Sequence, residues 1–245
     1  MIYEIAGLRV LLDNQYSFTD KFCQAYLAEN QTSPVDIVSR VSQEDLMAEK
    51  NLSPQYSDGY IENICLYRNL CLQLPAFNRM LLHAAVLEYD GNGYAFLGRS
   101  GAGKSTHTGL WLKYVGGKIV NGDKPILSFN QTEVIAHGTP WMGKEGRGYK
   151  ASVPLKALCF IEQAKENKIV KLTKSQLSTR LFSQLLIPSE EAAAIKTLDL
   201  TDLFLQLVPG YVLYCDISEA AVKTSFETLT GTPYPNNEQG EKNEN

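Results

Sequence analysis

The stretch "GRSGAGKS" at residues 98–105 constrains this chain more than any other, because it holds every fixed position of the phosphate-binding pattern G-x-x-x-x-G-K-[ST]. Such a loop turns on its glycines and points backbone amides inward, which forms a concave site for an anion. "YAFL" before the loop has the pattern of a strand, and "STHTGLWLKYV" after it has the pattern of a helix that begins near Lys104. The sequence therefore predicts a phosphate-binding loop between a strand and a helix, within an α/β fold.

The residue types of the loop predict that it binds the phosphates of a nucleotide. Lys104 is expected to reach the β- and γ-phosphates, and the hydroxyl of Ser105 to ligate Mg²⁺. The alternative is a chance match in a glycine-rich turn, which the flanking strand and helix patterns oppose. The residues predicted to bind the nucleotide are Gly98, Arg99, Ser100, Gly101, Ala102, Gly103, Lys104, Ser105 and Thr106.

The strand that leads into the loop is expected to belong to a hairpin. "HAAVLEYDGNGYAFLG" contains two short apolar runs around a turn-forming "DGNG". With Gly91 and Asn92 at the turn, Leu87 faces Phe96, and His83 falls beside the phosphate loop. Most loops of this kind are reached through a parallel sheet and a helical crossover, so a hairpin there is unusual.

A second anchor for the metal is expected just downstream, because nucleotide-binding sites of this kind use an acid at the end of a nearby apolar strand. Asp123 follows the apolar pair Ile119–Val120 in "KIVNGDKP" and is the suitably placed carboxylate. The alternative is a plain turn residue, because "NGD" is also typical of turns. Lys124 beside it is either a phosphate contact or a solvated surface lysine.

A glycine-rich segment, "HGTPWMGKEGRGYK", follows a second predicted hairpin around Asn130–Gln131. It carries Glu145 and Arg147, with a lysine on either side of them, and could close over a nucleotide or an acceptor. The alternative is an ordinary solvated loop. Glu145 and Arg147 are therefore candidate catalytic residues beside His83, Lys104 and Asp123.

The whole chain is predicted to divide into three parts. Residues 1–75 form a small N-terminal section with a strand over Ile2–Leu12, a helix near Asp20–Glu29 and a strand followed by a helix in "GYIENICLYRNLCLQL". Residues 76–230 form the nucleotide-binding domain, with helices over 175–186 and 189–207, a late strand in "GYVLYCDI" and a last helix capped by Ser218. Residues 231–245 are polar and are expected to be disordered.

Composition excludes several classes of partner. The 245 residues carry a net charge of −4 with a pI near 5.5, and no dense basic block, which argues against nucleic acid and anionic membranes. No run approaches the ~20 apolar residues of a membrane span. Five scattered cysteines without C-x-x-C spacing indicate reduced thiols in a cytoplasmic protein.

The order of histidine, hairpin, phosphate loop, helix and carboxylate turn resembles the catalytic domain of HPr kinase/phosphorylase. The residues that carry the resemblance are "LHAAVLEYDGNGYAFLGRSGAGKSTHTGLW", "VNGDKPIL" and "GTPWMGKEG", and phosphoenolpyruvate carboxykinases share the loop at greater distance. The resemblance implies a mixed-sheet α/β domain that uses ATP and Mg²⁺ to phosphorylate a serine hydroxyl on a protein or peptide. Relatives form oligomers, so it is also compatible with a homo-oligomer.

One position departs from the resembled family. His83 and Asp123 match its histidine and the second of its two consecutive aspartates, but the first aspartate, which acts on the acceptor hydroxyl, is Gly122 here. A well-placed base typically adds ~10²–10⁴-fold to the rate. The leading hypothesis is an ATP-dependent phosphotransferase acting on a hydroxyl of a peptide, a protein or a small molecule. The alternative is a nucleotide-binding module of weak or no activity that acts through a protein partner.

The remaining histidines and tryptophans have alternatives of their own. His107 either touches the base or ribose or packs in its helix, and His137 is expected to be structural. Trp111 and Trp141 could stack on adenine, although Trp111 has the position of a core residue.

Overall fold

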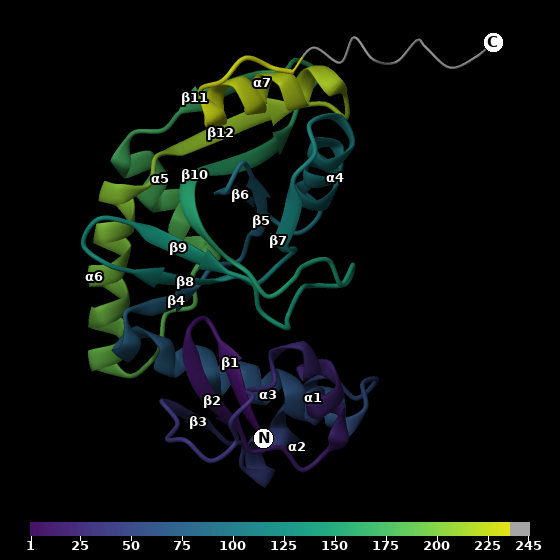
Figure 1. Ribbon diagram of the computed structural model, residues 1–245, viewed down its shortest axis with the longest axis vertical. Coiled ribbons are helices and arrows are strands. Elements are labelled where there is room, and N and C mark those ends of the chain that lie inside the picture. The colour runs from purple at the N-terminus through teal and green to yellow at the C-terminus, as the bar shows by residue number, and fades with distance from the viewer. Residues whose placement is uncertain (236–245) are drawn as a thin grey trace, which may run out of the picture.

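Two β-sheets build the part of the chain that this computed structural model describes, residues 1–235. The smaller sheet has the strand order β1-β2-β3, formed by Ile2–Ile5, Leu8–Leu12 and Ile37–Ser39. Helices α1 (Ser17–Phe22), α2 (Gln43–Leu52) and α3 (Asp58–Gln73) and the short 3-10 helix η1 (Gln24–Tyr26) pack around it. In Figure 1 this N-terminal layer lies at the bottom, and a second 3-10 helix, η2 (Leu74–Phe77), leads out of it.

The larger sheet has nine strands in the order β4-β8-β9-β10-β6-β5-β7, with β12 paired to β10 and β11 paired to β12. The strands are β4 (Arg79–Leu81), β5 (Ala85–Tyr89), β6 (Asn92–Leu97), β7 (Lys118–Asn121), β8 (Ile126–Phe129), β9 (Val134–His137), β10 (Ser152–Gln163), β11 (Lys168–Lys171) and β12 (Gly210–Cys215). Strand β10 runs parallel to β6 and β12, whereas the other pairs are antiparallel. The predicted mixed-sheet α/β fold is confirmed.

The strand before the phosphate loop, β6, lies in the predicted hairpin with β5, but the register differs by two residues. The pairs are Tyr89↔Asn92 and Leu87↔Tyr94, so Asp90 and Gly91 form the turn. Both have positive φ, 50° and 72°, as the two central residues of a type I′ turn require. The prediction had placed Gly91 and Asn92 there. A shift of two residues keeps every side chain on its predicted face, because strand side chains alternate with period two.

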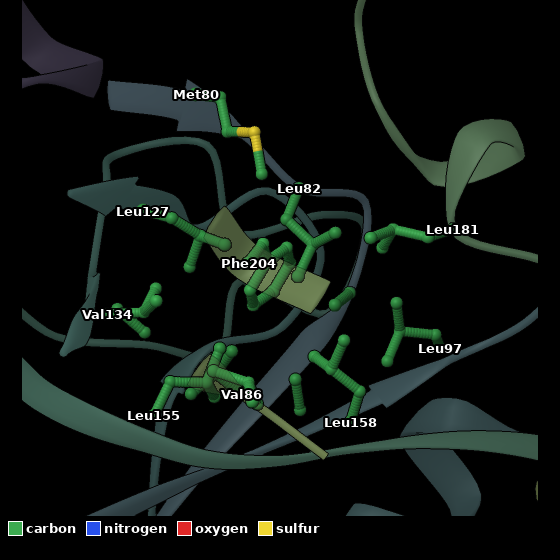
Figure 2. Close-up of a cluster of buried hydrophobic side chains, with 14 of the residues drawn as sticks. Met80, Leu82, Val86, Leu97, Leu127, Val134, Leu155, Leu158, Leu181 and Phe204 are labelled. Atoms are coloured by element: carbon green, nitrogen blue, oxygen red, sulfur yellow. The ribbon is translucent and has the colours of Figure 1, made fainter. Parts of the chain in front are cut away.

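Helices cover both faces of the larger sheet. On one face, α5 (Lys174–Leu181) and α6 (Glu191–Leu207) pack on the cluster of Figure 2, in which Phe204 lies among Leu82, Val86 and Leu97. On the other face, α4 (Lys104–Tyr114) and α7 (Glu219–Thr230) enclose Trp111 and Phe226. Both predicted helices after residue 174 are present, the first ending in the 3-10 helix η3 (Phe182–Gln184), and Ser218 caps α7 by accepting a hydrogen bond from the amide of Ala221.

The N-terminal section differs from the prediction in three places. The strand expected over residues 2–12 is a hairpin, because Ala6 and Gly7 adopt positive φ and turn the chain. The helix expected near residues 20–29 begins earlier and ends at Phe22. The segment expected to be a strand and then a helix is the single helix α3, because Ser57 caps its first turn and its buried residues follow helical spacing.

The start of the predicted disordered tail is attached to the domain. Gly231 ends α7 in the left-handed conformation, and the ring of Tyr234 lies edge-on to Phe226. The Tyr234 hydroxyl also donates to Glu219 Oε1 at 3.0 Å. The remainder of that prediction, residues 236–245, lies outside the described residues.

The strand directions bring distant segments to one edge of the larger sheet. Because β6, β10 and β12 are parallel, and β7 runs antiparallel to β5 as β6 does, all four end at the same edge. The segments after these strands therefore lie near one another. Strand β5 begins at this edge, so His83 and Ala84, which precede it, lie there too. In open α/β sheets, ligands bind outside the carboxyl ends of the strands.

Candidate functional site

The segment predicted to bind phosphate, residues 98–103, is called the phosphate loop below, and it connects β6 to α4 as the sequence predicted. Gly98, Gly101 and Gly103 have φ of 147°, 80° and 106°, a region that side chains other than glycine rarely adopt. A Cβ on Gly98 would lie 2.9 Å from the Cβ of Ala102, so the loop closes tightly on itself. Helix α4 begins at Lys104, and its first-turn amides and the positive end of its dipole therefore face the loop.

Lys104 lies folded over the start of the loop. Its Nζ donates to the carbonyl of Gly98 at 2.9 Å and to that of Arg99 at 3.4 Å. Burial lowers the pKa of Lys104, and the negative charge of Asp123 opposes that effect. The two side chains thus influence each other across the cavity.

Asp123 follows β7 and is surrounded by three potential cations. His83 Nε2 lies 3.1 Å from its Oδ1, and Lys124 Nζ lies 3.8 Å from its Oδ2. Burial alone would raise the pKa of Asp123, but the hydrogen bond from His83 and the charges of Lys124, His83 and Lys104 outweigh burial and lower it. The group is therefore a carboxylate at neutral pH.

A buried asparagine that the sequence analysis did not single out shapes the turn that carries Asp123. Asn121 is fully buried, and its Oδ1 accepts from the amides of Asp123 at 2.9 Å and Lys124 at 2.7 Å. Its Nδ2 donates to Thr139 Oγ1 at 2.9 Å, and that hydroxyl donates to the Lys124 carbonyl at 2.9 Å. The signal was present in "VNGD", because asparagine side chains commonly bond the backbone two residues on.

The position where the resembled family has its first aspartate is enclosed by backbone. A Cβ on Gly122 would lie 2.8 Å from the carbonyl oxygen of Met142 and 3.1 Å from that of Arg147. A Cβ on Gly143 would likewise meet Asp123 at 2.7 Å. The segment 142–148 thus occupies the room that a side chain at position 122 would need.

The glycine-rich segment is attached at its end and projects at its centre. Gly148 forms an antiparallel bridge with Asn121, and the amide of Tyr149 donates to Val120 at 3.2 Å, so this end extends the sheet beyond β7. Arg147 Nε and Glu145 Oε2 form an ion pair of 3.3 Å, each about half exposed. The two predicted catalytic residues of this segment are therefore each other's partners.

A cavity of about 550 Å³ brings most of the predicted residues together. It is lined by His83, Ser100, Gly101, Gly103, Lys104, Ser105, Thr106, Asp123, Lys124, Lys144, Glu145 and Arg147, among others. Three predicted nucleotide-binding residues do not line it. Gly98 and Arg99 line a cavity between the loop and α5, and Ala102 lines a third on the far side of the loop from Asp123.

The other histidines and the tryptophans do not face this cavity. His107 is 2% exposed, with Nε2 2.9 Å from Ser225 Oγ, and burial lowers its pKa to about 4. His137 lies between two serine hydroxyls, as a structural histidine does. Trp111 is fully buried, and Trp141 donates from Nε1 to Asn63 Oδ1 in the junction with the N-terminal section. The alternative of a ring stacking on adenine is therefore wrong for both tryptophans.

The described residues contain neither a cluster of metal-binding side chains nor a membrane-spanning helix. Within residues 1–235, no three or more His, Cys, Asp or Glu side chains are grouped so that they could hold a metal ion. No helix in this range has the length and apolar character to cross a bilayer. The five cysteines are buried and unpaired.

Comparisons with known proteins give matches among solved structures and to one family model. No curated protein matches this chain. Among solved structures, the HPr(Ser) kinase/phosphatase from Coxiella burnetii matches at 12% identity and a TM-score of 0.34, over 62% of this chain and 93% of that one. The family model described as "SynChlorMet cassette protein ScmC" matches residues 63–219, which include β4 to β12 and both sides of the cavity. The chain belongs to the SynChlorMet cassette protein ScmC family.

Proposed function

We propose that this protein is an ATP-dependent phosphotransferase that transfers the γ-phosphoryl group to a hydroxyl. The observation that carries the proposal is the single cavity in which the start of α4, with Lys104 and Ser105, faces the ionised Asp123. A phosphate loop opposite a carboxylate at the end of a nearby strand is what phosphoryl transfer from a nucleotide requires. The resemblance of the sequence motifs to HPr kinase/phosphorylase supports the same reaction.

The residues of the cavity fit a magnesium ion. Mg²⁺ is usually held by one or two carboxylates, phosphate oxygens and water, rather than by a cage of protein ligands. Asp123 is a carboxylate, Ser105 supplies a hydroxyl, and both line the cavity. Bound there with the nucleotide, Mg²⁺ would neutralise phosphate charge.

The cationic side chains of the cavity would stabilise the transferring phosphoryl group. Lys104 is placed at the loop, Lys124 beside Asp123, and Arg147 in the projecting segment. Charge spreads over the phosphoryl oxygens in the transition state, and cations fixed around it account for most of the catalysis. His83 lies beside Asp123 and marks the side of the cavity where we place the acceptor hydroxyl, on a peptide, a protein or a small molecule.

A second candidate function is favoured by Gly122. Residue 122 is a glycine, so the chain offers no acid there to accept the proton of an acceptor hydroxyl, and backbone oxygens enclose the position. A module that binds nucleotide and acts through a protein partner would need no such acid. Both candidates place the protein in the cytoplasm, where ATP is available and its unpaired cysteines stay reduced.

Labelled ATP separates the two candidates. Purified protein with γ-labelled ATP, Mg²⁺ and cell extract should label one acceptor species, and Asp123→Asn should reduce the labelling by about 10²-fold or more. Asp199→Asn, an exposed aspartate on α6, is the matched control and should leave labelling unchanged. Equal labelling by Asp123→Asn and wild type would contradict the assignment of Asp123 as a ligand of the metal, and labelling no greater than that of the extract without the protein would contradict the phosphotransferase proposal. Tight ATP binding with no labelled species would favour the binding module instead.

A further inference from the structure

A second cavity of about 320 Å³ lies on the far side of the phosphate loop from Asp123. It shares Gly101, Gly103 and Thr106 with the first cavity, so the two cavities adjoin the same part of the loop. None of His83, Asp123 and Lys124 lines it. We call this second cavity the side slot.

The side slot is built at the carboxyl ends of three parallel strands. Gly101 and Gly103 follow β6, Gln163 and Ala164 end and follow β10, and Ile217 follows β12. The amide of Ala164 donates to the carbonyl of Cys215 at 2.9 Å, which ties the ends of β10 and β12 together. The slot therefore occupies the position at which open α/β sheets bind ligands.

The polarity of the loop fixes which end of a nucleotide points towards the side slot. A lysine of this kind reaches the β- and γ-phosphates, and the following hydroxyl reaches the metal, so these phosphates belong on the side of Asp123. The rest of the nucleotide must then leave the loop on its other side, past Thr106, which lines both cavities. We propose that the nucleoside of the bound triphosphate lies in the side slot, an inference that rests on the nucleotide binding proposed above.

The walls of the side slot suit a flat base. Leu110, Ile161, Ala164 and Ile217 supply apolar surface. Ile217 is 78% exposed, yet it stands in an ordered turn, because Asn167 Oδ1 accepts from the amide of Asp216 at 3.1 Å and the next residue caps α7. A nucleoside against this side chain would cover apolar surface that is otherwise in water.

The polar rim of the side slot selects among bases. Asp216 Oδ1 accepts from Asn167 Nδ2 at 3.0 Å and from the Ser218 hydroxyl, which positions its carboxylate at the slot. A carboxylate accepts hydrogen bonds and donates none, so it matches the amino group of adenine and not the carbonyl that uracil has instead. The slot is accordingly expected to prefer ATP to UTP.

Binding of Mg²⁺-ATP and of Mg²⁺-tripolyphosphate, measured by calorimetry, tests the assignment. Wild type should bind ATP more tightly than tripolyphosphate, which has no nucleoside. Ala164→Trp, which fills the slot, should abolish that advantage and leave tripolyphosphate binding unchanged. Ile217→Ala should weaken ATP binding about three- to ten-fold, in line with the loss of part of one buried aliphatic side chain.

Ile195→Ala is the matched control, because Ile195 is also an exposed isoleucine, 53% accessible, but lies on α6 away from the slot. It should change neither affinity. Asp216→Asn should bring the affinities for ATP and UTP closer together, because an amide can donate to the uracil carbonyl.

The outcomes separate the slot from the function on which it rests. Two results would place the nucleoside elsewhere and leave the phosphate site intact. In the first, ATP binds no more tightly than tripolyphosphate; in the second, the higher affinity for ATP persists in both Ala164→Trp and Ile217→Ala. If neither compound binds, the proposed nucleotide binding fails and the slot assignment fails with it. A preference for ATP over UTP that survives Asp216→Asn would overturn the role of Asp216.

Discussion

The side chains that face the main cavity are partly exposed to solvent, whereas the polar side chains behind them are buried. Asp123 and Lys124 are 26% and 43% exposed, and Lys104 touches only loop carbonyls. Asn121, by contrast, is fully buried and bonded on both ends of its amide, and His107 is buried between α4 and α7, beside Ser225. The facing groups can change partners when a ligand arrives, whereas the buried groups cannot change without exposing unpaired polar atoms.

The difference divides the site into two kinds of residue. Substitution of a buried group should lower the free energy of unfolding, whereas substitution of a facing group should impair binding and leave stability nearly unchanged. Free energies of unfolding from denaturant titration, compared with ATP affinity, measure both effects. The four predictions below run from the largest expected changes in stability, which the first two share, to the smallest.

Asn121→Ala should have the largest effect among the substitutions at neutral pH. It removes the acceptor of two partly buried amides, those of Asp123 and Lys124, and the donor to the buried Thr139 hydroxyl. Unsatisfied buried groups cost about 1–3 kcal/mol each, so we expect a loss of about 3 kcal/mol in the free energy of unfolding. Asn130→Ala, whose side chain holds an exposed hairpin loop by similar bonds, is the control and should cost about 1 kcal/mol. A loss for Asn121→Ala no greater than that of the control would contradict the contrast.

The buried, neutral side chain of His107 should make the free energy of unfolding fall as the pH is lowered. Burial lowers its pKa from the ordinary 6.5 to about 4, so the folded state stays neutral while the unfolded state takes up a proton. The unfolded state then binds more protons between pH 6.5 and 4, and stability should fall by about 1.4 kcal/mol per pH unit from this group in that window. Below pH 4 the folded state is protonated as well, and the loss from His107 ends.

The pH dependence of His107→Gln checks this assignment. Its free energy of unfolding should fall less steeply than that of wild type between pH 6.5 and 4, because glutamine does not titrate. Identical slopes for the two proteins would show that His107 does not cause the acid loss.

Gly122→Ala should cost less, about 1–2 kcal/mol, because the segment 142–148 can move outward to relieve the contact of 2.8 Å with the Met142 carbonyl. That movement should loosen the backbone around Lys144 and Arg147, whose side chains are already exposed, and make trypsin cleave there faster than in wild type. Gly109→Ala is the control, since its Cβ would meet nothing closer than an Arg147 nitrogen at 3.8 Å, and it should not lower stability. Unchanged cleavage in Gly122→Ala would mean that the segment does not rest on position 122.

Gly122 also shows where prediction from sequence succeeded and where it stopped. The phosphate loop, the start of α4 and the hairpin before them depend on neighbouring residues, namely glycines that permit positive φ and short apolar runs. Patterns of this kind are visible in sequence. The absence of a side chain at position 122 was also visible in the sequence. The two carbonyls that enclose this position were not, because they belong to residues 142 and 147, which are distant in the sequence.

Features that depend on packing were predicted less well. The hairpin register was two residues off, because the apolar pattern fits both registers and only the φ values of Asp90 and Gly91 distinguish them. Helix α3 was expected to begin as a strand, because its aromatic and β-branched residues favour strands until burial against the small sheet decides. The supporting role of Asn121 requires Thr139, eighteen residues away, and the side slot requires the ends of three strands.

Lys104→Met should have the smallest effect on stability and a large one on binding. The Lys104 ammonium bonds only to the carbonyls of Gly98 and Arg99, at the partly exposed loop, and its burial lowers its pKa, so the folded state gains little from its charge. We expect the free energy of unfolding to change by about 0.5 kcal/mol or less. Affinity for Mg²⁺-ATP should fall by about 10²-fold, because the substitution removes the cation that reaches the phosphates. Lys156→Met, an exposed lysine on β10, is the matched control and should leave both quantities unchanged. If Lys104→Met destabilised the fold as Asn121→Ala does while ATP affinity held, the distinction between facing and buried groups would not apply to this site.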